Sequence, residues 1–135
     1  QIHTNFNTKS INISGKTKEY FMLENIGHGG YQAGFDYIIG GNDNTSGIAI
    51  WHIDDNQSGN NDYNHKLVDL EEAAEAGLDL GTHSGKQTNL FFSGNKTEFS
   101  DSTDPNSKTY SGTSSGITID NISAAGDSMT FDITF

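Results

Sequence analysis

The segment from Asp54 to His65 places oxygen-bearing side chains at a spacing that suits a calcium ion. Counted from Asp54, oxygen-bearing residues occupy positions 1, 3, 5 and 9, and a glycine occupies position 6. This matches the first half of an EF-hand loop, where alternate side chains converge on the ion and glycine allows a sharp turn. We therefore expect a structural calcium ion, with a carboxylate from further along the chain completing the site. The expected ligands are Asp54, Asn56, Ser58, Asn60, Asp62, Asp69, Glu71 and Glu72.

The match to an EF-hand loop is incomplete, and a second interpretation stays open. Position 12, where the bidentate Glu belongs, is His65, and an apolar strand-like run replaces the entering helix. Loops rich in Asn and Asp also fold without an ion, because these side chains bond to their own backbone in Asx-turns. The alternative is thus a polar loop whose carboxylates face solvent.

The histidines and serines are not spaced for hydrolytic chemistry. A zinc hydrolase needs converging imidazoles, commonly His-Glu-x-x-His on one helix. No two of the five histidines lie within a helical turn of each other, although His52 and His65 can meet across a loop. A Gly-x-Ser-x-Gly elbow is also absent from the sequence. We expect no catalytic residue in this chain.

Two further groups of polar or aromatic residues have simple structural interpretations. Residues 100–107 form an oxygen-rich loop in which Asp and Asn are expected to cap the backbone around Pro105. Trp51 lies within an apolar run and is expected in the core between two sheets. Four tyrosines in loop-like contexts could stack on sugars: Tyr31, Tyr37, Tyr63 and Tyr110.

The composition limits the classes of partner. The 135 residues fit one domain, which we take as residues 1–135, a piece of a longer protein. Seven Lys+Arg against 18 Asp+Glu give a net charge of −11. Nucleic acid and anionic membrane surfaces are therefore poor partners, whereas hard divalent cations suit the excess of oxygens. No apolar run reaches membrane-spanning length, so no membrane insertion is expected.

Short apolar runs separated by Gly, Asn, Ser and Thr predict an all-β fold. Residues 11–13 and 19–25 flank a Ser14-Gly15-Lys16 turn and predict a hairpin. Residues 48–53 are the most hydrophobic run and predict a central strand, with Ile48, Ile50 and His52 on one face.

The C-terminal run alternates strictly and predicts a half-buried strand over residues 129–135. Residues 117–119 predict another strand, and residues 67–77 predict a strand that continues into a helical turn. Residues 27–46 and 77–116 are long polar loops. The expected architecture is an antiparallel β-sandwich of jelly-roll type with long polar loops and at most one short helix.

Several segments, taken in order, resemble one protein family. They are residues 19–25 (EYFMLEN), 30–34 (GYQAG), 47–54 (GIAIWHID), 65–73 (HKLVDLEEA), 99–107 (FSDSTDPNS), 115–123 (SGITIDNIS) and 129–131 (MTF). Together they are similar to the region after the catalytic domain in the peptidase M6 family, the secreted metalloproteases resembling immune inhibitor A. The resemblance covers nearly the whole chain.

The resemblance implies a non-catalytic C-terminal accessory module of a secreted or surface-bound bacterial zinc metalloprotease. Such a module would be a β-sandwich that stabilises or positions the protease domain of the same polypeptide, with structural calcium. The zinc ligands of the family belong to an upstream segment that this chain lacks. One departure concerns the metal: the family continues with Asp-Gly after the Asp-Leu-Glu-Glu-Ala run, whereas Ala74 and Glu75 follow here.

A second function class stays open from the residues themselves. The chain can be a stand-alone carbohydrate-binding or adhesin-like module whose aromatic residues contact glycans. A docking module is expected to expose an apolar patch, and a glycan-binding module is expected to expose Tyr or Trp side chains.

Overall fold

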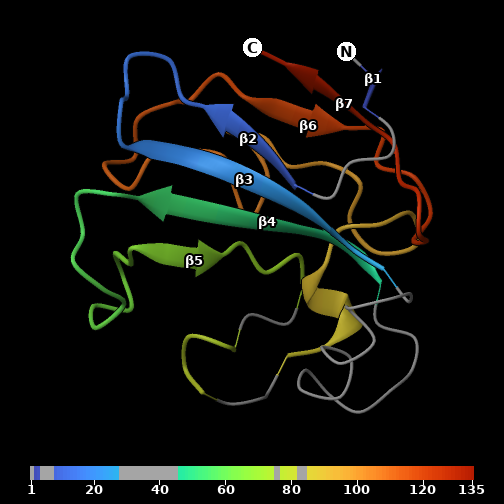
Figure 1. Cartoon of the computed structure of the whole chain (residues 1–135), viewed down its shortest axis with the longest axis horizontal. Helices are drawn as coiled ribbons and strands as arrows, with labels where there is room; N and C mark the ends of the chain where they lie inside the picture. Colours follow the sequence, from blue (N-terminus) through green and yellow to red (C-terminus); the bar gives the residue numbers. More distant parts are fainter. Residues whose placement is uncertain (1, 4–7, 28–45, 75–76, 82–84) are drawn as a thin grey trace.

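The computed structural model describes residues 2–3, 8–27, 46–74, 77–81 and 85–135, and its fold is all-β (Figure 1). A four-stranded antiparallel sheet has the order β2-β3-β4-β5, and a three-stranded antiparallel sheet has the order β1-β7-β6. The strands are β1 (Ile2–His3), β2 (Thr8–Asn12), β3 (Glu19–Ile26), β4 (Gly47–Asp54), β5 (Val68–Leu70), β6 (Thr118–Asp120) and β7 (Phe131–Thr134). The all-β class is confirmed, and the jelly-roll type of sandwich stays a prediction.

Strands β2 and β3 form the predicted hairpin. Ile11 lies opposite Phe21 in the register, and both point into the core. Gly15 has φ of +74°, a conformation that glycine adopts without steric cost, and Lys16 N donates to Ile13 O at 3.0 Å to close the turn. The turn therefore fixes the register that the alternating pattern requires.

Strand β4 is central, as predicted, and both of its faces carry apolar side chains. Ile48 and Ile50 are fully buried in the main core. Trp51 is on the opposite face, where it is partly exposed and packs beside Ala49 and Leu90. The prediction that Trp51 lies between the sheets is thus wrong, because the second sheet covers only the Ile50 face of β4 and alternation places Trp51 on the opposite face.

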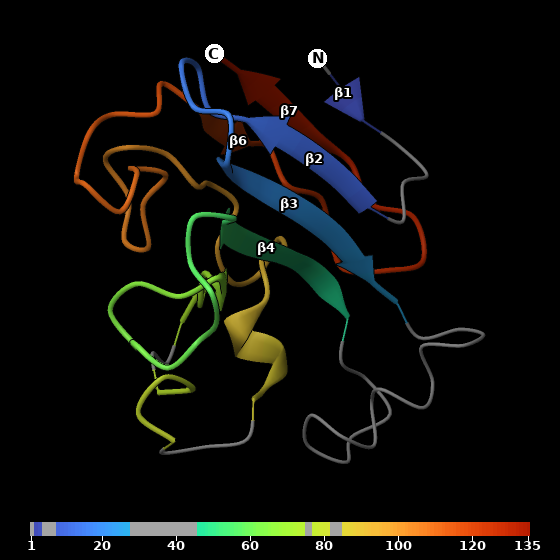
Figure 2. The same ribbon diagram turned by 60° about the vertical axis from the view of Figure 1, so that its left-hand side comes forward.

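One apolar core joins the two sheets. It takes Phe21 from β3, Phe131 from β7, and Phe91 and Phe99 from the long segment between β5 and β6. Each fully buried Phe side chain stabilises the fold by about 1.5–3 kcal/mol. In Figure 2, β6 and β7 lie beside β2, at the end of the molecule where the two chain termini are.

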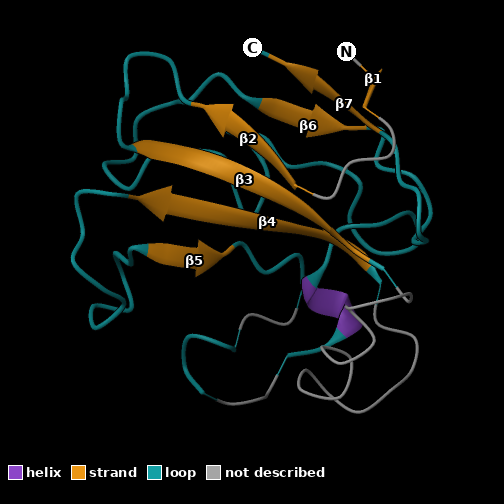
Figure 3. Ribbon diagram, in the orientation of Figure 1, coloured by secondary structure: helices purple, strands orange, loops and turns teal. Residues whose placement is uncertain are grey.

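The long polar segment after β5 is held to the sheets by backbone bonds. Phe91 forms an isolated bridge to Ile48, and Phe99 forms one to Ile119. A Cβ at Gly47 would meet the Leu90 Cβ at 2.8 Å, so glycine is needed where this segment crosses β4. The segment also holds the short 3-10 helix η2 (Gln87–Asn89), drawn in purple in Figure 3.

Two details of the predicted elements differ from the structure. Residues 71–74 are not helical after β5, and residues 75–76 lie outside the described residues. Within the described residues the short helix is η2 instead. Phe135 is 80% exposed because β7 ends at Thr134, whereas Met129, Phe131 and Ile133 are buried as expected. The loop predicted over residues 27–46 falls almost wholly outside the described residues.

Candidate functional site

A buried polar group of connected side chains centres on His52 of β4. Its Nε2 lies 3.1 Å from Glu19 Oε1, and its Nδ1 lies 3.1 Å from Glu71 Oε1. The His52 side chain is 4% exposed, and those of Glu19 and Glu71 are 8% and 16% exposed. Three strands or their ends supply the group, since Glu19 begins β3 and Glu71 follows β5.

Full hydrogen bonding within this group requires an additional proton. A neutral imidazole donates from one nitrogen only, and an ionised carboxylate only accepts. Two carboxylates on the two nitrogens of His52 therefore require either an imidazolium or one protonated carboxyl group. Burial raises the pKa of Glu71 above its ordinary range. The hydrogen bond and the charge of His52 act in the opposite direction, as does Lys66, and the charge of Asp69 raises the pKa further. Glu71 thus retains a proton more readily than an exposed glutamate.

Two aromatic rings pack against the imidazole of His52. Tyr110 stacks on His52 with ring centroids 4.2 Å apart, and Phe21 lies 4.5 Å from His52. His65 also lies 4.2 Å from Tyr110, so the phenol ring is between the two imidazoles. The backbone N–H of Tyr110 donates to Glu19 Oε1 at 2.7 Å. Burial, followed by the charges of Asp69 and Glu71, raises the pKa of Tyr110. The group therefore attaches the Tyr110 segment to the four-stranded sheet.

Asp54, at the end of β4, is a buried carboxylate with partners of its own. Its Oδ2 lies 2.8 Å from His65 Nε2, and its Oδ1 accepts from the backbone and side-chain nitrogens of Asn56. Burial acts to raise the pKa of Asp54, but the hydrogen bonds from Asn56 and His65 outweigh it and hold the pKa below its ordinary value.

The other predicted calcium ligands of the loop are used within the loop or exposed. Asn60 bonds through its side chain to both the N–H and the C=O of Val68, which occupies the outer edge of β5. Asp62 accepts from Asn64 N at 3.0 Å in an Asx-type turn, and Ser58 is exposed. The carboxylate and amide groups of Asp54, Asn60 and Asp62 are thus directed to separate partners.

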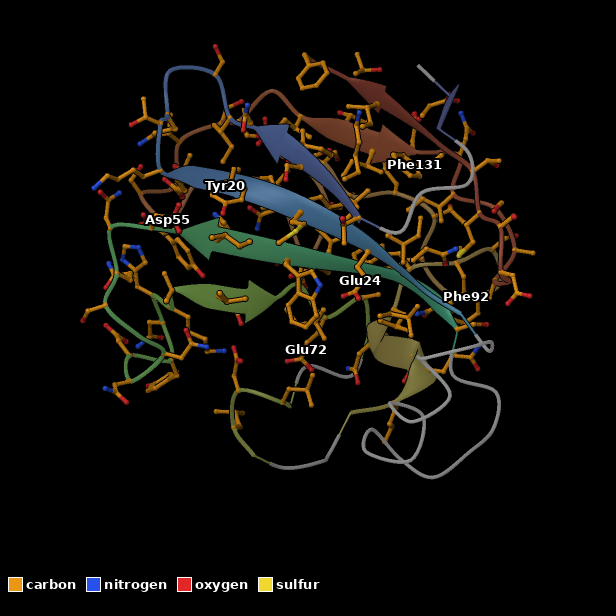
Figure 4. The ribbon with its side chains drawn as sticks, in the orientation of Figure 1. Tyr20, Glu24, Asp55, Glu72, Phe92 and Phe131 are labelled. Carbon is orange, nitrogen blue, oxygen red and sulfur yellow. The ribbon has the colours of Figure 1, made fainter. Side chains whose placement is uncertain are left out.

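The remaining three predicted ligands are brought together at a different place. Asp69, Glu71 and Glu72 line a cavity of about 280 Å³, together with Asp79 and Asp104. Lys66 bonds to both Asp69 and Asp79, and Glu72 accepts from Gly77 N, Leu78 N and Asn89 Nδ2. Figure 4 shows Glu72 beneath the four-stranded sheet, in the segment that follows β5. Within the described residues, no three His, Asp or Glu side chains are arranged to hold a metal ion.

The loop over residues 100–107 is organised by Asp101. Its carboxylate accepts from Ser115 N at 3.0 Å and Gly116 N at 3.0 Å, and it also bonds to the hydroxyls of Ser107 and Ser114. Burial acts to raise the pKa of Asp101, but these hydrogen bonds outweigh it and lower the pKa. The predicted local cap is present at Asn106, whose Oδ1 accepts from Lys108 N at 3.1 Å, whereas Asp101 caps backbone 14 and 15 positions further along the chain.

Sequence reasoning found part of this site. His52 and His65 do meet, but through the ring of Tyr110 between them. Glu19 and Tyr110 were not anticipated, because 33 and 58 positions separate them from His52 and no short motif contains both partners. His28 and His83, like Tyr31 and Tyr37, lie outside the described residues.

Comparisons of this chain with known proteins identified no relative. No protein-family model matches the chain, and neither a curated protein nor a solved structure matches it. No helix in the described parts of the chain is long and apolar enough to cross a membrane.

Proposed function

We propose that this chain is a non-catalytic accessory module of a secreted M6-like metalloprotease, and that it stabilises or positions the protease domain. The ordered segments that resemble this family carry the proposal. They coincide with the elements that build the fold: 19–25 lies in β3, 47–54 is β4, and 65–73 contains β5. The family-like residues are thus those that form the sheet and its attached loops.

The environment of His52 supports the non-catalytic part of the proposal. His52 belongs to the family-like segment 47–54, yet both of its nitrogens face carboxylates, Tyr110 stacks on its ring and Phe21 lies against it at a tilt. A catalytic imidazole needs one nitrogen free to reach a substrate. The geometry therefore favours a structural role for this residue.

A structural calcium ion is part of the proposal. Carboxylate and carbonyl oxygens are the ligands that calcium prefers. The chain supplies such oxygens in the loop that precedes β5 and again in β5 and the segment after it, so the donor atoms are of the type that calcium binds. At Asp54 an ion would have to displace His65 and Asn56 from the carboxylate, and at Asp69 it would have to displace Lys66.

The upstream coding sequence and a truncation test the proposal. We expect the DNA preceding Gln1 to encode a domain with a His-Glu-x-x-His segment. A full-length protease shortened by residues 1–135 should then lose thermal stability, or cleave large protein substrates less well while still cleaving a short peptide. An upstream sequence without a zinc-protease motif would contradict the proposal, as would a truncated enzyme that matches the full-length protein in stability and on all substrates.

A further inference from the structure

Asp54 ends β4 and is the first of the proposed calcium ligands, and both of its carboxylate oxygens already have donors. Its Oδ1 accepts from the backbone N–H of Asn56 at 3.0 Å and from the side-chain amide of Asn56 at 2.7 Å. Its Oδ2 lies 2.8 Å from Nε2 of His65. The Asp54 side chain is 6% exposed. Because calcium binds oxygens at about 2.3–2.6 Å and gathers about 6–8 ligands, it reaches Asp54 only if one of these two neighbours moves away.

His65 is the neighbour that can leave Asp54 without unfolding the loop. Its side chain is 37% exposed, so it can turn into solvent. The backbone N–H of Asn56 is held in place by the turn in which Gln57 N donates to Asp54 O at 3.0 Å, and the Asn56 amide can rotate to offer its oxygen to the ion. Calcium takes oxygen ligands in preference to imidazole nitrogen, so His65 and the ion compete for the same carboxylate.

The ring of His65 also packs on Tyr110, which belongs to the long segment between β5 and β6. The centroids of these two rings are 4.2 Å apart, and Tyr110 stacks on His52 at the same separation with an interplanar angle of 13°. The Tyr110 ring therefore lies between a buried imidazole and a partly exposed one. When His65 turns into solvent, Tyr110 loses one of these two ring contacts.

Tyr110 lines a cavity of about 410 Å³ together with His52. It joins the turn over residues 109–113 to the four-stranded sheet, because its N–H donates to Glu19 and its ring stacks on His52. Hydrogen bonds within the turn close it on itself. The loss of the His65 contact therefore loosens this turn beside the cavity.

We propose that His65 is an internal competitor of calcium at Asp54, and that calcium binding releases His65 from both the Asp54 carboxylate and the ring of Tyr110. The inference rests on the calcium ion of the proposed function and adds the regulation of its site. The coupling is reciprocal, because the free energy that links two equilibria acts equally in both directions. Contacts that hold His65 in place therefore weaken calcium binding, although Tyr110 supplies no ligand to the ion.

The opposite role for His65 makes the opposite prediction. Carboxylates that ligate metals are themselves hydrogen-bonded, and such partners orient the ligand and raise the affinity. If His65 supported Asp54 in this way, removal of the imidazole would weaken calcium binding. The low exposure of Asp54 favours competition, because a partner that supports a ligand leaves the ion an open approach.

The test is a calorimetric titration of the purified chain with calcium chloride at one fixed pH and ionic strength. We expect His65→Ala to bind calcium about threefold to tenfold more tightly than the native chain, since one competing hydrogen bond is lost. Tyr110→Leu, which keeps the backbone N–H bond to Glu19, should also tighten binding. The matched control is Asn64→Ala, next to His65, which retains its backbone N–H bond to Asp62 and should bind calcium with native affinity.

NMR spectra measure the release of Tyr110. Calcium should shift the ring resonances of Tyr110 in the native chain but not in His65→Ala, and Asp54→Ala should remove both the shift and the binding. Thermal melts verify that each variant is folded, and Tyr110→Leu provides the result if His65→Ala is not.

The outcomes separate the competition from the calcium site itself. Calcium binding that is equal or weaker in His65→Ala overturns the competition while the calcium site stands. So do Tyr110 ring resonances that calcium leaves unchanged in the native chain, or undiminished binding in Asp54→Ala. Absence of calcium binding in both the native chain and His65→Ala overturns the calcium ion of the proposed function together with the competition.

Discussion

At the scale of single residues, carboxylates hold this fold together by accepting hydrogen bonds in specific directions. Asp101, Asp54 and Glu19 each accept bonds from groups distant in sequence, the longest linking Glu19 to Tyr110. Hydrogen bonds to a charged acceptor are about twice as strong as neutral ones. A chain with 18 acidic residues therefore uses some of them as structural ties between loops.

Asp101→Asn tests one such tie. The amide cannot accept the backbone N–H groups of Ser115 and Gly116 together with two hydroxyls, so unfolding should become easier by about 2 kcal/mol at neutral pH. Because the pKa of Asp101 is lowered in the folded chain, its contribution is present above pH 3.8 and is lost as the pH falls further. Urea melts at pH 7 and near pH 3 should show a smaller difference between the two proteins at the lower pH. A constant difference would mean that the charge of Asp101 is unimportant.

The two carboxylates that flank His52 should respond differently to neutralisation. Glu19 accepts both a backbone N–H and His52, so Glu19→Gln should destabilise the chain, whereas Glu71→Gln should have little effect or stabilise it. The raised pKa of Glu71 means that its contribution is present below pH 4.5 and is lost as the pH rises through the folded value. Thermal melts in EDTA at pH values below and above 4.5 should show that the melting temperature of Glu71→Gln depends less on pH than that of the native chain. An equal loss of stability in both variants would contradict this assignment.

Calcium should raise the melting temperature. Binding to the folded state alone contributes about 2.7 kcal/mol at one hundred times Kd, which amounts to several degrees for a chain of this size. Melts of the native chain and of Asp54→Ala, each in EDTA and in millimolar calcium, separate this effect from the loss of the His65 and Asn56 bonds. Identical native melts in EDTA and calcium, or an undiminished calcium shift in Asp54→Ala, would show that the Asp54 loop binds no ion.

At the scale of elements, side chains on the two faces of the four-stranded sheet contribute differently to the free energy of unfolding. Phe21 on the inner face is completely buried, whereas Trp51 on the outer face is only partly covered. Phe21→Ala should therefore cost about 3–5 kcal/mol, and Trp51→Ala only about 1–2 kcal/mol despite its larger side chain. Urea unfolding followed by circular dichroism measures both, with Tyr63→Ala as a nearly neutral reference. A larger loss for Trp51→Ala than for Phe21→Ala would place the tryptophan in the core after all.

At the scale of the whole molecule, the proposed role is to stabilise or position a protease domain and not to catalyse a reaction. We expect the isolated chain to show no peptidase activity with or without added zinc, because His52 is enclosed and His65 bonds to Asp54. A casein assay and a fluorogenic peptide assay, each with a zinc metalloprotease as positive control, measure this. Peptidase turnover by the isolated chain would refute the expectation if it disappears in His52→Ala or His65→Ala variants that are shown to be folded.

The sequence by itself determined where the main strands lie and which side chains share a face of each strand. Alternation with a period of two is a local property, so the hairpin of β2 and β3, the central place of β4 and the buried side of β7 followed from the residues. Local turns of the Asx type, such as those at Asp62 and Asn106, also followed from the residues, because Asp and Asn bond to nearby backbone in polar loops.

Only the tertiary structure decided which side chains meet and which face of the sheet is covered. Glu19, His52 and Tyr110 come from separate elements, and no local pattern relates their positions. Alternation showed that Ile50 and Trp51 face opposite ways, but it could not show that the second sheet covers only the Ile50 side. That choice depends on where the remaining strands pack, which is a property of the assembled core. It leaves Trp51 and Tyr20 partly exposed on the outer face of the four-stranded sheet.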